Sequence, residues 1–450
     1  MELLGQLFRC EDVERVLSDR ACLQGMLDFE AGLARAEARA GVISSSAAAV
    51  IAAKCSAELF DFAELGRGAK LSGNIAIPLV RALTALVAQS DKDAARYVHW
   101  GATSQDAIDT GCVLQLRQAL KFISDDLDLL AKDLAELATK HRLTIMVGRT
   151  WMQQALPTTF GAKVAGWLDA VDRHRERLRE MQRRALVLQF GGAVGTLAAL
   201  GERGPDVARN LVEELALGLP EIPWHSHRDR MAEVAMTLGL CVGTLGKIAK
   251  DIALHSQTEI AEVFEPAEKG RGGSSTMPHK RNPVAAAVIL SAAMRVPGLV
   301  STMLAAMVQE QERGLGGWHA EWETLPEIVS LSAGALRRML EIAPGLEVDV
   351  RRMTENLEAT RGLIFAEAVA MALAEKVGKA AAHDAVEKAC DVARTEGKHL
   401  REVILAGGLV RGQLSEEQVA GLFEAGRYLG SAELFVDRVV AASQRIERTT

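Results

Sequence analysis

The most informative stretch of this sequence is Gly272-Gly273-Ser274-Ser275-Thr276-Met277-Pro278-His279-Lys280-Arg281-Asn282-Pro283. Its glycines and prolines disfavour a helix, so the stretch is predicted to be a loop. The loop brings together hydroxyls, backbone N–H donors, two cations and an amide. Donors and cations that are already in place stabilise negative charge as it develops on oxygen during a reaction. We therefore expect the loop to bind a carboxylate or carbanionic substrate.

The composition of this loop alone would also suit a solvated surface segment. The order of its residues, however, resembles the signature of the fumarase/aspartase superfamily at nearly every position. In that signature the first serine exchanges a proton with carbon, which implies this role for Ser274, with Ser275 as the alternative. The resemblance also implies that Lys280 and Asn282 contact a substrate carboxylate.

A second segment that resembles the superfamily is Tyr97-Val98-His99-Trp100-Gly101-Ala102-Thr103-Ser104-Gln105-Asp106, which follows the pattern His-x-Gly-x-Thr-Ser-x-Asp. Thr103 and Ser104 could donate hydrogen bonds to a carboxylate, and His99 could orient the substrate or carry a proton. A structural interpretation instead makes residues 104–106 a helix N-cap and His99 a core residue. Because helix N-termini attract anions, capping and substrate binding are compatible.

The third segment with this resemblance is Gly148-Arg149-Thr150-Trp151-Met152-Gln153. Most C–N and C–O lyases of the superfamily have Gly-x-Thr-His-x-Gln here, and that histidine protonates the leaving group. Thr150 and Gln153 match the pattern, but Trp151 occupies the histidine position. The resemblance implies a substrate-binding wall that lacks its acid, and the alternative for Trp151 is a core filler.

The absence of the acid histidine limits which leaving groups the site can release. An amine or hydroxide must be protonated to leave, whereas a carboxylate, whose conjugate acid has a pKa of about 4, leaves as an anion near neutral pH. A tryptophan therefore suits a reaction in which a carboxylate adds to a double bond of the same molecule to form a lactone. The resemblance thus implies the 3-carboxy-cis,cis-muconate cycloisomerase branch of the superfamily. That branch forms 4-carboxymuconolactone from a small tricarboxylate in the protocatechuate route of aromatic degradation.

Residues 312–323 agree with this branch. Adenylosuccinate lyases resemble Glu-Arg-x-Leu-x-x-Ser-x-x-x-Arg in this region, where the serine and second arginine serve the nucleotide end of the substrate. Trp318 and Trp322 stand at these two positions here, and an indole does not pair with phosphate. Arg313 remains a candidate carboxylate ligand, with a surface ion pair as the alternative.

Two other functions are compatible with the sequence. One is a C–N lyase of the adenylosuccinate or argininosuccinate kind, which releases fumarate. The other belongs to a different class, a structural protein on an enzyme scaffold, as some lens crystallins of this superfamily are.

The fold is expected to be all-α. Of the 450 residues, 49% are hydrophobic but only 4% aromatic, which favours close-packed helices. Apolar stripes at helical spacing, Leu127-Leu130-Leu134-Leu137 and Leu245-Ile248-Ile252, predict long amphipathic helices. We expect three domains, an N-terminal helical domain (1–110), a central long-helix bundle with the signature loop (111–355) and a C-terminal helical domain (356–450). The resemblance implies a homotetramer with a shared helical core and active sites built from several subunits.

The composition and the N-terminus indicate which partners and which compartment to expect. The formal charge of −7 argues against a nucleic-acid partner. Six separated cysteines without a CxxC pair indicate a reducing compartment, and the N-terminus lacks signal-peptide character. The apolar run 284–294 is expected to stop at Arg295 and to be too short to span a membrane. We expect a cytoplasmic enzyme that needs neither a cofactor nor a metal.

Other motifs carry less weight. The run 225–227, His-Ser-His, is expected to be a loop before a helix, and Gly191-Gly192-Ala193-Val194-Gly195-Thr196 is expected to be a turn between helices. Charged residues 173–177 are interpreted as a solvated helix face. His141 is kept as a minor site candidate near a helix end, where an imidazolium would be favoured.

Overall fold

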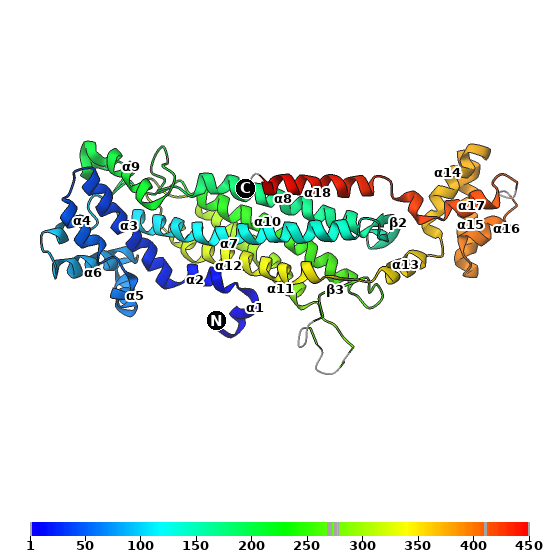
Figure 1. Cartoon of the computed structure of the whole chain (residues 1–450), viewed down its shortest axis with the longest axis horizontal. Helices are drawn as coiled ribbons and strands as arrows, with labels where there is room; N and C mark the ends of the chain where they lie inside the picture. Colours follow the sequence, from blue (N-terminus) through cyan, green and yellow to red (C-terminus); the bar gives the residue numbers. More distant parts are fainter. Residues whose placement is uncertain (1, 268–271, 274–276, 278, 409–411, 449–450) are drawn as a thin grey trace. The chain divides into compact units, whose positions relative to one another are not determined.

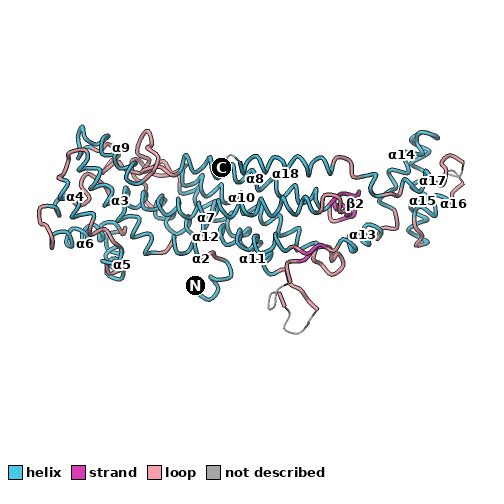
Figure 2. The backbone as a smooth tube through the Cα atoms, viewed as in Figure 1, coloured by secondary structure: helices cyan, strands magenta, loops and turns pink. Residues whose placement is uncertain are grey.

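The computed structural model describes residues 2–267, 272–273, 277, 279–408 and 412–448. Within these ranges the secondary structure is almost entirely helical, which confirms the all-α prediction (Figures 1 and 2). The α-helices are α1 (Glu2–Phe8), α2 (Glu11–Val16), α3 (Asp19–Arg39), α4 (Ser45–Ala52), α5 (Phe62–Ser72), α6 (Ala76–Ala88), α7 (Ser104–Lys140), α8 (Phe160–Ala185), α9 (Gly204–Leu215), α10 (Asp229–His255), α11 (Val284–Ala306), α12 (Gly317–Ile342), α13 (Val350–Glu358), α14 (Ala366–Val377), α15 (Lys379–Glu396), α16 (Leu400–Ala406), α17 (Glu416–Leu422) and α18 (Ala432–Arg448).

The strands of the described ranges form two small antiparallel pairs, drawn in magenta in Figure 2. Strand β1 (Ile145–Thr150) pairs with β2 (Gln153–Thr159), and β3 (Val263–Phe264) pairs with β4 (Glu347–Val348). Short 3-10 helices are η1 (Ala57–Leu59), η2 (Ala94–Tyr97), η3 (Ala198–Arg203), η4 (Ala343–Gly345), η5 (Leu363–Phe365) and η6 (Ala425–Tyr428).

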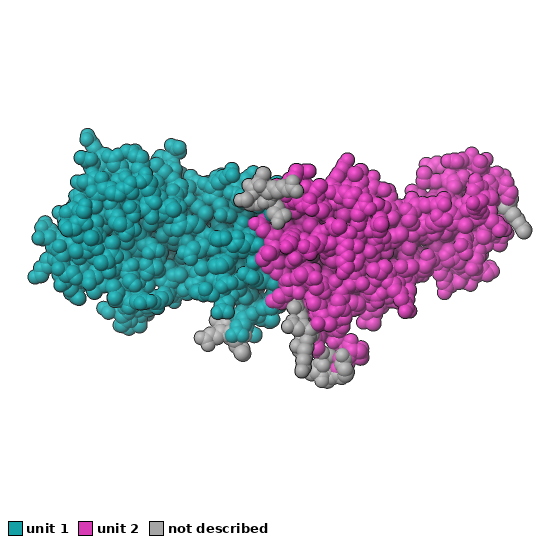
Figure 3. Space-filling view, in the orientation of Figure 1, with its two compact units in different colours: residues 1–127, 173–246, 288–338 teal, residues 128–172, 247–287, 339–450 magenta. Residues whose placement is uncertain are grey.

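The chain divides into two compact units, each assembled from separated segments (Figure 3). Unit 1 comprises Met1–Leu127, Arg173–Gly246 and Val288–Arg338, and unit 2 comprises Asp128–Asp172, Lys247–Ala287 and Met339–Thr450. This division groups residues by contacts rather than along the sequence. The three sequential domains expected above remain a prediction.

Helix α3 forms the centre of the N-terminal core of unit 1. Ser18 caps its first turn, because its hydroxyl accepts a hydrogen bond from the Ala21 N–H at 3.3 Å. Its apolar stripe, which includes Leu27, Phe29 and Leu33, is fully buried in a cluster that also takes in residues of α4, α6 and α9. Helix α3 is therefore held by packing along most of its length.

Two glycines let α3 cross the first half of α7 closely. A Cβ added at Gly25 would lie 2.8 Å from the carbonyl oxygen of Gly111, and one added at Gly111 would lie 2.9 Å from the backbone nitrogen of Met26. Real Cβ atoms do not come so near to backbone atoms. The two helices can therefore touch only because both positions lack a side chain.

The expected apolar stripes are confirmed. All four leucines of the stripe on α7 and all three residues of the stripe on α10 are buried. The interpretation of residues 173–177 on α8 as a solvated face was wrong for two of them. His174 and Arg175 are buried, and His174 Nε2 lies 2.7 Å from Thr244 Oγ1 on α10, whereas Arg173, Glu176 and Arg177 are exposed.

Helix α11 is longer than the sequence suggested. The apolar run 284–294 was expected to stop at Arg295, but the helix continues through Pro297 to Ala306 and has 23 residues. Helices α10 and α11 both reach the length and apolar character of a membrane span by composition alone. Only 33% of the apolar window of α11 is buried within the chain, against 61% for α10.

The C-terminal part of unit 2 has a small core of its own. Helices α14 to α17 bury an apolar cluster that includes Val369, Leu373, Val386 and Leu400. A capping box starts α17, since the Ser415 hydroxyl accepts from the Gln418 N–H and the Gln418 side chain accepts from the Ser415 N–H. Helices α16 and α17 are short, with seven residues each.

One buried side chain on α3 lacks a polar partner among the described residues. Glu37 is 0% exposed, and neither of its carboxyl oxygens has a hydrogen-bond partner there. Burial, with a smaller contribution from the nearby carboxylate of Glu30, raises the pKa of Glu37 to about 9. The side chain is therefore a neutral acid at neutral pH.

The raised pKa of Glu37 predicts a pH-dependent loss of stability. Between the unfolded pKa of about 4.3 and the folded pKa, only the unfolded state releases this proton, so the free energy of unfolding falls as pH rises, by about 1.4 kcal/mol per pH unit. Glu37→Gln, which cannot ionise, should remove this part of the decline in thermal unfolding measured from pH 5 to 9. The same replacement at the exposed Glu176 should leave the slope unchanged, and equal slopes for wild type and Glu37→Gln would contradict the assignment.

Candidate active site

Residues 97–106, the Thr103 segment, lead into the first turn of α7 in unit 1. The Asp106 carboxylate reaches back and accepts the Thr103 N–H at 3.0 Å, so Asp106 caps the helix as its third residue. Thr103 and Ser104 are both half-buried at this end. The predicted capping role of residues 104–106 is thus confirmed, and it is compatible with anion binding at the same helix end.

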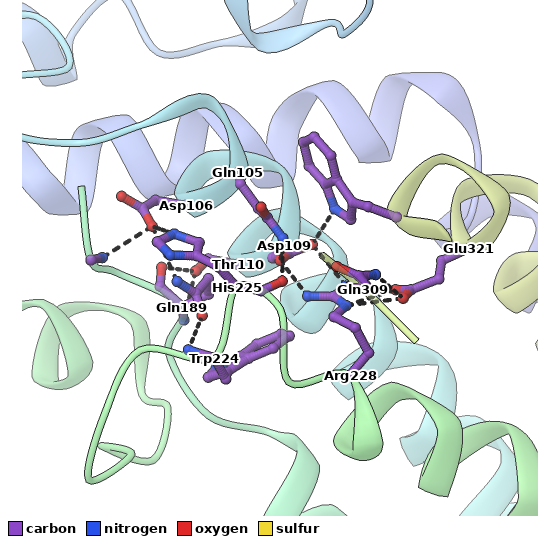
Figure 4. A network of polar contacts seen from close by, with 12 residues as sticks. Gln105, Asp106, Asp109, Thr110, Gln189, Trp224, His225, Arg228, Gln309 and Glu321 are labelled. Atoms are coloured by element: carbon purple, nitrogen blue, oxygen red, sulfur yellow. Dashed lines mark hydrogen bonds and ion pairs between the residues drawn. The ribbon is translucent and has the colours of Figure 1, made fainter. Parts of the chain in front are cut away.

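Asp106 also joins this segment to two others (Figure 4). Its Oδ1 accepts from the Gly191 N–H at 3.0 Å, and its Oδ2 accepts from the Gly192 N–H at 2.9 Å. His225 Nε2 lies 2.7 Å from Oδ1, and Gln189 Nε2 donates to the same oxygen at 3.2 Å. This fully buried carboxylate therefore accepts five hydrogen bonds. It holds the backbone at Thr103 and at Gly191 and Gly192, and it holds the side chains of Gln189 and His225.

Arg313 bridges the Thr103 segment and the loop that begins at Gly191. It donates to Thr103 Oγ1 at 3.0 Å and to the carbonyl oxygen of Ala193 at 2.9 Å. Because Arg313 uses the Thr103 oxygen as an acceptor, the hydroxyl proton of Thr103 stays available for another acceptor. The turn at residues 191–196, which the sequence had set aside, thus lies directly beside two predicted site residues.

His99 lies near the start of the Thr103 segment and has a partner that the sequence did not reveal. Its Nδ1 lies 2.5 Å from Oε1 of Glu30, a residue of α3 that is 2% exposed. The alternative interpretation of His99 as a core residue is only partly correct, because 14% of its side chain remains exposed.

A second buried network in unit 1 surrounds Arg228, just before α10 (Figure 4). Its guanidinium donates to both oxygens of Asp109 on α7, at 2.6 and 3.1 Å, and to Glu321 on α12. Trp318 Nε1 donates to Asp109 at 2.9 Å. The two carboxylates outweigh burial and raise the pKa of Arg228 above its ordinary value. Trp318 therefore has a defined role in the core of unit 1.

In unit 2, the hairpin of β1 and β2 carries Thr150, Trp151 and Gln153, which are all exposed. The two-residue turn consists of Trp151 and Met152, with φ values of 51° and 64°. This is the left-handed region that a type I′ turn requires and that residues other than glycine rarely adopt. Trp151 is 98% exposed, so its interpretation as a core filler was wrong.

A buried carboxylate anchors this hairpin. Arg149 donates to both oxygens of Glu262, at 2.9 and 2.6 Å, while His255 Nδ1 and Asn356 Nδ2 each lie 2.8 Å from the same carboxylate. Burial alone would raise the pKa of Glu262, but these hydrogen bonds lower it to about 2. The base of the hairpin is thereby fixed while its tip stays exposed.

The signature loop belongs to unit 2, and Ser274 and Ser275 lie outside the described residues. At its neck, the Asn282 N–H and Nδ2 both donate to the Gly272 carbonyl oxygen, at 2.9 and 3.0 Å. Arg281 pairs with Glu347 at 2.8 Å, and Lys280 is exposed. In this arrangement the Asn282 amide holds the neck of the loop, and Lys280 and Arg281 are exposed cations beside it.

His141 follows the last residue of α7, as expected, but it is buried and its ring edge faces Phe160. Its Nδ1 lies 3.1 Å from Thr144 Oγ1, and its Nε2 has no partner among the described residues. Burial, together with Lys140, lowers the pKa of His141, so the expected imidazolium is not favoured here.

Metal ligation has no visible basis in the described parts of the chain. There, no group of three or more His, Cys, Asp or Glu side chains is placed to hold a metal ion. The Nε2 atom of His225, the first residue of the His-Ser-His run, is hydrogen-bonded to Asp106. The run itself forms the loop before α10, as expected.

Comparison with known proteins places this geometry in a family. Residues 11–298 match the family described as "Lyase", and residues 362–439 match the adenylosuccinate lyase C-terminus. The chain belongs to the fumarase/aspartase superfamily of lyases. The resemblance seen in the three sequence segments is thereby confirmed for the chain as a whole.

Within this superfamily, the chain is similar to one group of enzymes. It is 55% identical to the 3-carboxy-cis,cis-muconate cycloisomerase of Pseudomonas aeruginosa, over 98% of this chain and 96% of that protein. It is 53% identical to the cycloisomerase of the same name from Bradyrhizobium diazoefficiens, over 98% of each. The crystal structure of 3-carboxy-cis,cis-muconate lactonizing enzyme from Pseudomonas putida superposes with a TM-score of 0.95 at 52% identity, covering 99% of this chain and 100% of that one.

The Asp106 network of this lyase predicts a large effect for a minimal change. Asp106→Asn replaces an acceptor oxygen with an N–H₂ donor that faces other donors, so the free energy of unfolding should fall by about 3 kcal/mol. Asp125→Asn, on the exposed face of the same helix, should cost about 0.5 kcal/mol or less. Urea unfolding followed by circular dichroism at one fixed protein concentration measures both, and equal losses would show that the network contributes little.

Proposed function

We propose that this chain is a 3-carboxy-cis,cis-muconate cycloisomerase, which converts 3-carboxy-cis,cis-muconate to 4-carboxymuconolactone. The observation that carries the proposal is the full-length similarity to cycloisomerases at 55% and 53% identity. The exposed indole of Trp151, at the position where most C–N and C–O lyases have their acid, supports the same reaction. The enzyme would act in the protocatechuate branch of aromatic degradation.

The reaction requires one new bond to oxygen and one to hydrogen. A carboxylate oxygen of the substrate adds to one carbon of a C=C bond, and the neighbouring carbon receives a proton from the enzyme, which solvent replaces. The lactone therefore carries one negative charge fewer than the tricarboxylate. We assign the proton transfer to Ser274, with Ser275 as the alternative. The hydroxyls of Thr103 and Ser104 and the cation of Lys280 are assigned to the substrate carboxylates.

The remaining assignments come from the superfamily resemblance, and contacts within each segment support them. Arg313 orients the Thr103 hydroxyl and adds positive charge beside it. Asn282, which holds the neck of the signature loop, is assigned to substrate binding together with the loop. Thr150, Trp151 and Gln153 would form the wall beside the reacting chain. No acid is needed on that wall, because the departing group of the reverse reaction is a carboxylate.

We further infer a homotetramer whose active sites combine segments of different subunits. Thr103 and Ser104 belong to unit 1, and the Trp151 hairpin belongs to unit 2. The resemblance to the superfamily supports a site that takes the two segments from different copies.

The surface of α11 supports the same assembly. This helix is the more apolar of the two long apolar helices, and Val284, Met294 and Leu304 are among its exposed residues. A second copy of the chain would cover this apolar surface. Similarity to crystallised enzymes supports a soluble protein, and we infer the cytoplasm as its compartment because all six cysteines are free.

The first test of the function is an assay by ultraviolet absorbance. Purified enzyme should consume 3-carboxy-cis,cis-muconate and form the lactone, and it should release no fumarate from adenylosuccinate or argininosuccinate. Ser274→Ala should lower kcat by about a thousandfold or more while the fold and the oligomer persist. Fumarate release without muconate consumption would favour the C–N lyase, and a wild type inactive on every substrate would favour a structural protein.

Shared active sites predict complementation between two inactive variants. Thr103→Ala and Trp151→Ala should each have low activity alone, since each removes one segment of every site. Co-expression should restore about a quarter of the sites. Random assembly puts an intact Thr103 segment and an intact Trp151 hairpin into the same site at about that frequency. Activity per subunit of the purified hybrid measures this, and no recovery in hybrids of normal size would mean that each chain supplies both segments of its own site.

A further inference from the structure

Glu30 is a buried acid of α3 whose side chain contacts His99. The pair joins Nδ1 of the imidazole to Oε1 of the carboxylate at 2.5 Å, and only 2% of the glutamate is exposed. Removing a carboxylate from water costs several kcal/mol unless a cation or strong donors compensate. A glutamate at this position therefore needs an explanation that apolar packing does not provide.

The close crossing of α3 and α7 brings this acid to His99. Gly25 and Gly111 let the two helix backbones touch, and Glu30 follows Gly25 by little more than one turn on α3. His99 lies in the loop that leads into α7, and Figure 1 shows this end of α7 beside α3. Without the two glycines the helices would separate and the contact would lengthen.

The backbone of His99 adopts an unfavourable conformation in making this contact. Its φ is 60°, in the left-handed region, which costs a residue with a Cβ about 1–2 kcal/mol. Strained residues of this kind cluster at functional sites, where the surrounding structure holds them in place. The pair with Glu30 is one interaction that holds the ring in this position.

The contact also fixes which nitrogen of His99 remains available. A carboxylate only accepts hydrogen bonds, so Nδ1 must carry a proton and donate it to Glu30. Nε2 is then the ring nitrogen left for a ligand. With both nitrogens protonated, the ring would be a cation four residues before Thr103.

The charged groups that face His99 favour this cation. Burial lowers the pKa of the imidazole, but the carboxylates of Glu30 on α3 and Asp106 on α7 outweigh burial and raise it. The other buried acid of the α3 stripe, Glu37, is a neutral acid with a pKa of about 9. Of these two buried acids of α3, Glu30 is therefore the one that presents a carboxylate to His99.

We propose that Glu30 is a positioning residue that holds His99 as an imidazolium and leaves its Nε2–H to bind a carboxylate of the substrate. This proposal rests on the cycloisomerase function proposed above. It adds a cation to the carboxylate-binding groups of the Thr103 segment. It also explains why a buried glutamate lies behind the loop that carries this segment.

The test compares Glu30→Gln with Glu37→Gln, two identical replacements at buried positions of one helix. Loss of the Glu30 charge should lower the pKa of His99, so that kcat/KM falls several-fold at pH 8, mainly through KM, and recovers toward pH 6. Glu37→Gln should leave the pH profile of kcat/KM unchanged, because Glu37 does not contact His99. A pH-independent loss in Glu30→Gln would indicate a structural role and overturn the proposal.

A measurement without substrate separates this proposal from the proposed function. With histidines labelled at Cε1, the NMR titration of His99, assigned by its loss in His99→Gln, should shift to lower pH in Glu30→Gln. An unchanged midpoint would overturn the positioning role whatever reaction the enzyme catalyses. A shifted midpoint in a protein that does not consume the muconate would instead refute only the function.

If Glu30→Gln does not fold, Glu30→Asp serves in its place. This variant keeps the charge but moves it away from His99, so it should shift the titration in the same direction by a smaller amount. A midpoint equal to that of the wild type, despite the longer separation, would again argue against the proposal.

Discussion

The Asp106 carboxylate is the interaction on which the candidate site of unit 1 depends. Its five hydrogen bonds join the Thr103 segment, the loop at Gly191 and Gly192, and His225, which are far apart in the sequence. A buried carboxylate without these donors would be unstable, and the donors would be unsatisfied without the carboxylate. The site and the local fold therefore stabilise each other. Arg313 is held beside them by its hydrogen bonds to Thr103 and Ala193.

Much of the fold and the outline of the site could be predicted from the sequence. Helical stripes such as Leu127 to Leu137 reflect local periodicity, and the three segments carry recognisable residue orders. Partners across long separations were invisible, because no local pattern links Arg228 to Asp109 and Glu321, or His99 to Glu30. One signal for Glu30 was available, since Glu30 and Glu37 interrupt the apolar stripe of α3 and exposed acids would not lie there.

Other differences have equally physical reasons. Arg295 was expected to end the apolar segment of α11, but a single cation that pairs with Glu327 does not stop a helix. Trp151 was weighed as a core filler, but a tight turn places it at the tip of a hairpin, where 98% of it is exposed. A large, strained and uncovered aromatic side chain is costly for an isolated subunit. The proposed assembly, in which copies of the chain share their sites, would account for this exposure.

The uncovered apolar surface of α11 has a consequence for the life of the protein in the cell. In the proposed tetramer, a newly synthesised chain would carry this surface until it met other copies, so association would compete with aggregation from the moment of release from the ribosome. Dilution below the dissociation range would bring the same danger back to mature enzyme. The abundance of such a protein then depends on how quickly its copies find each other as well as on how well each one folds.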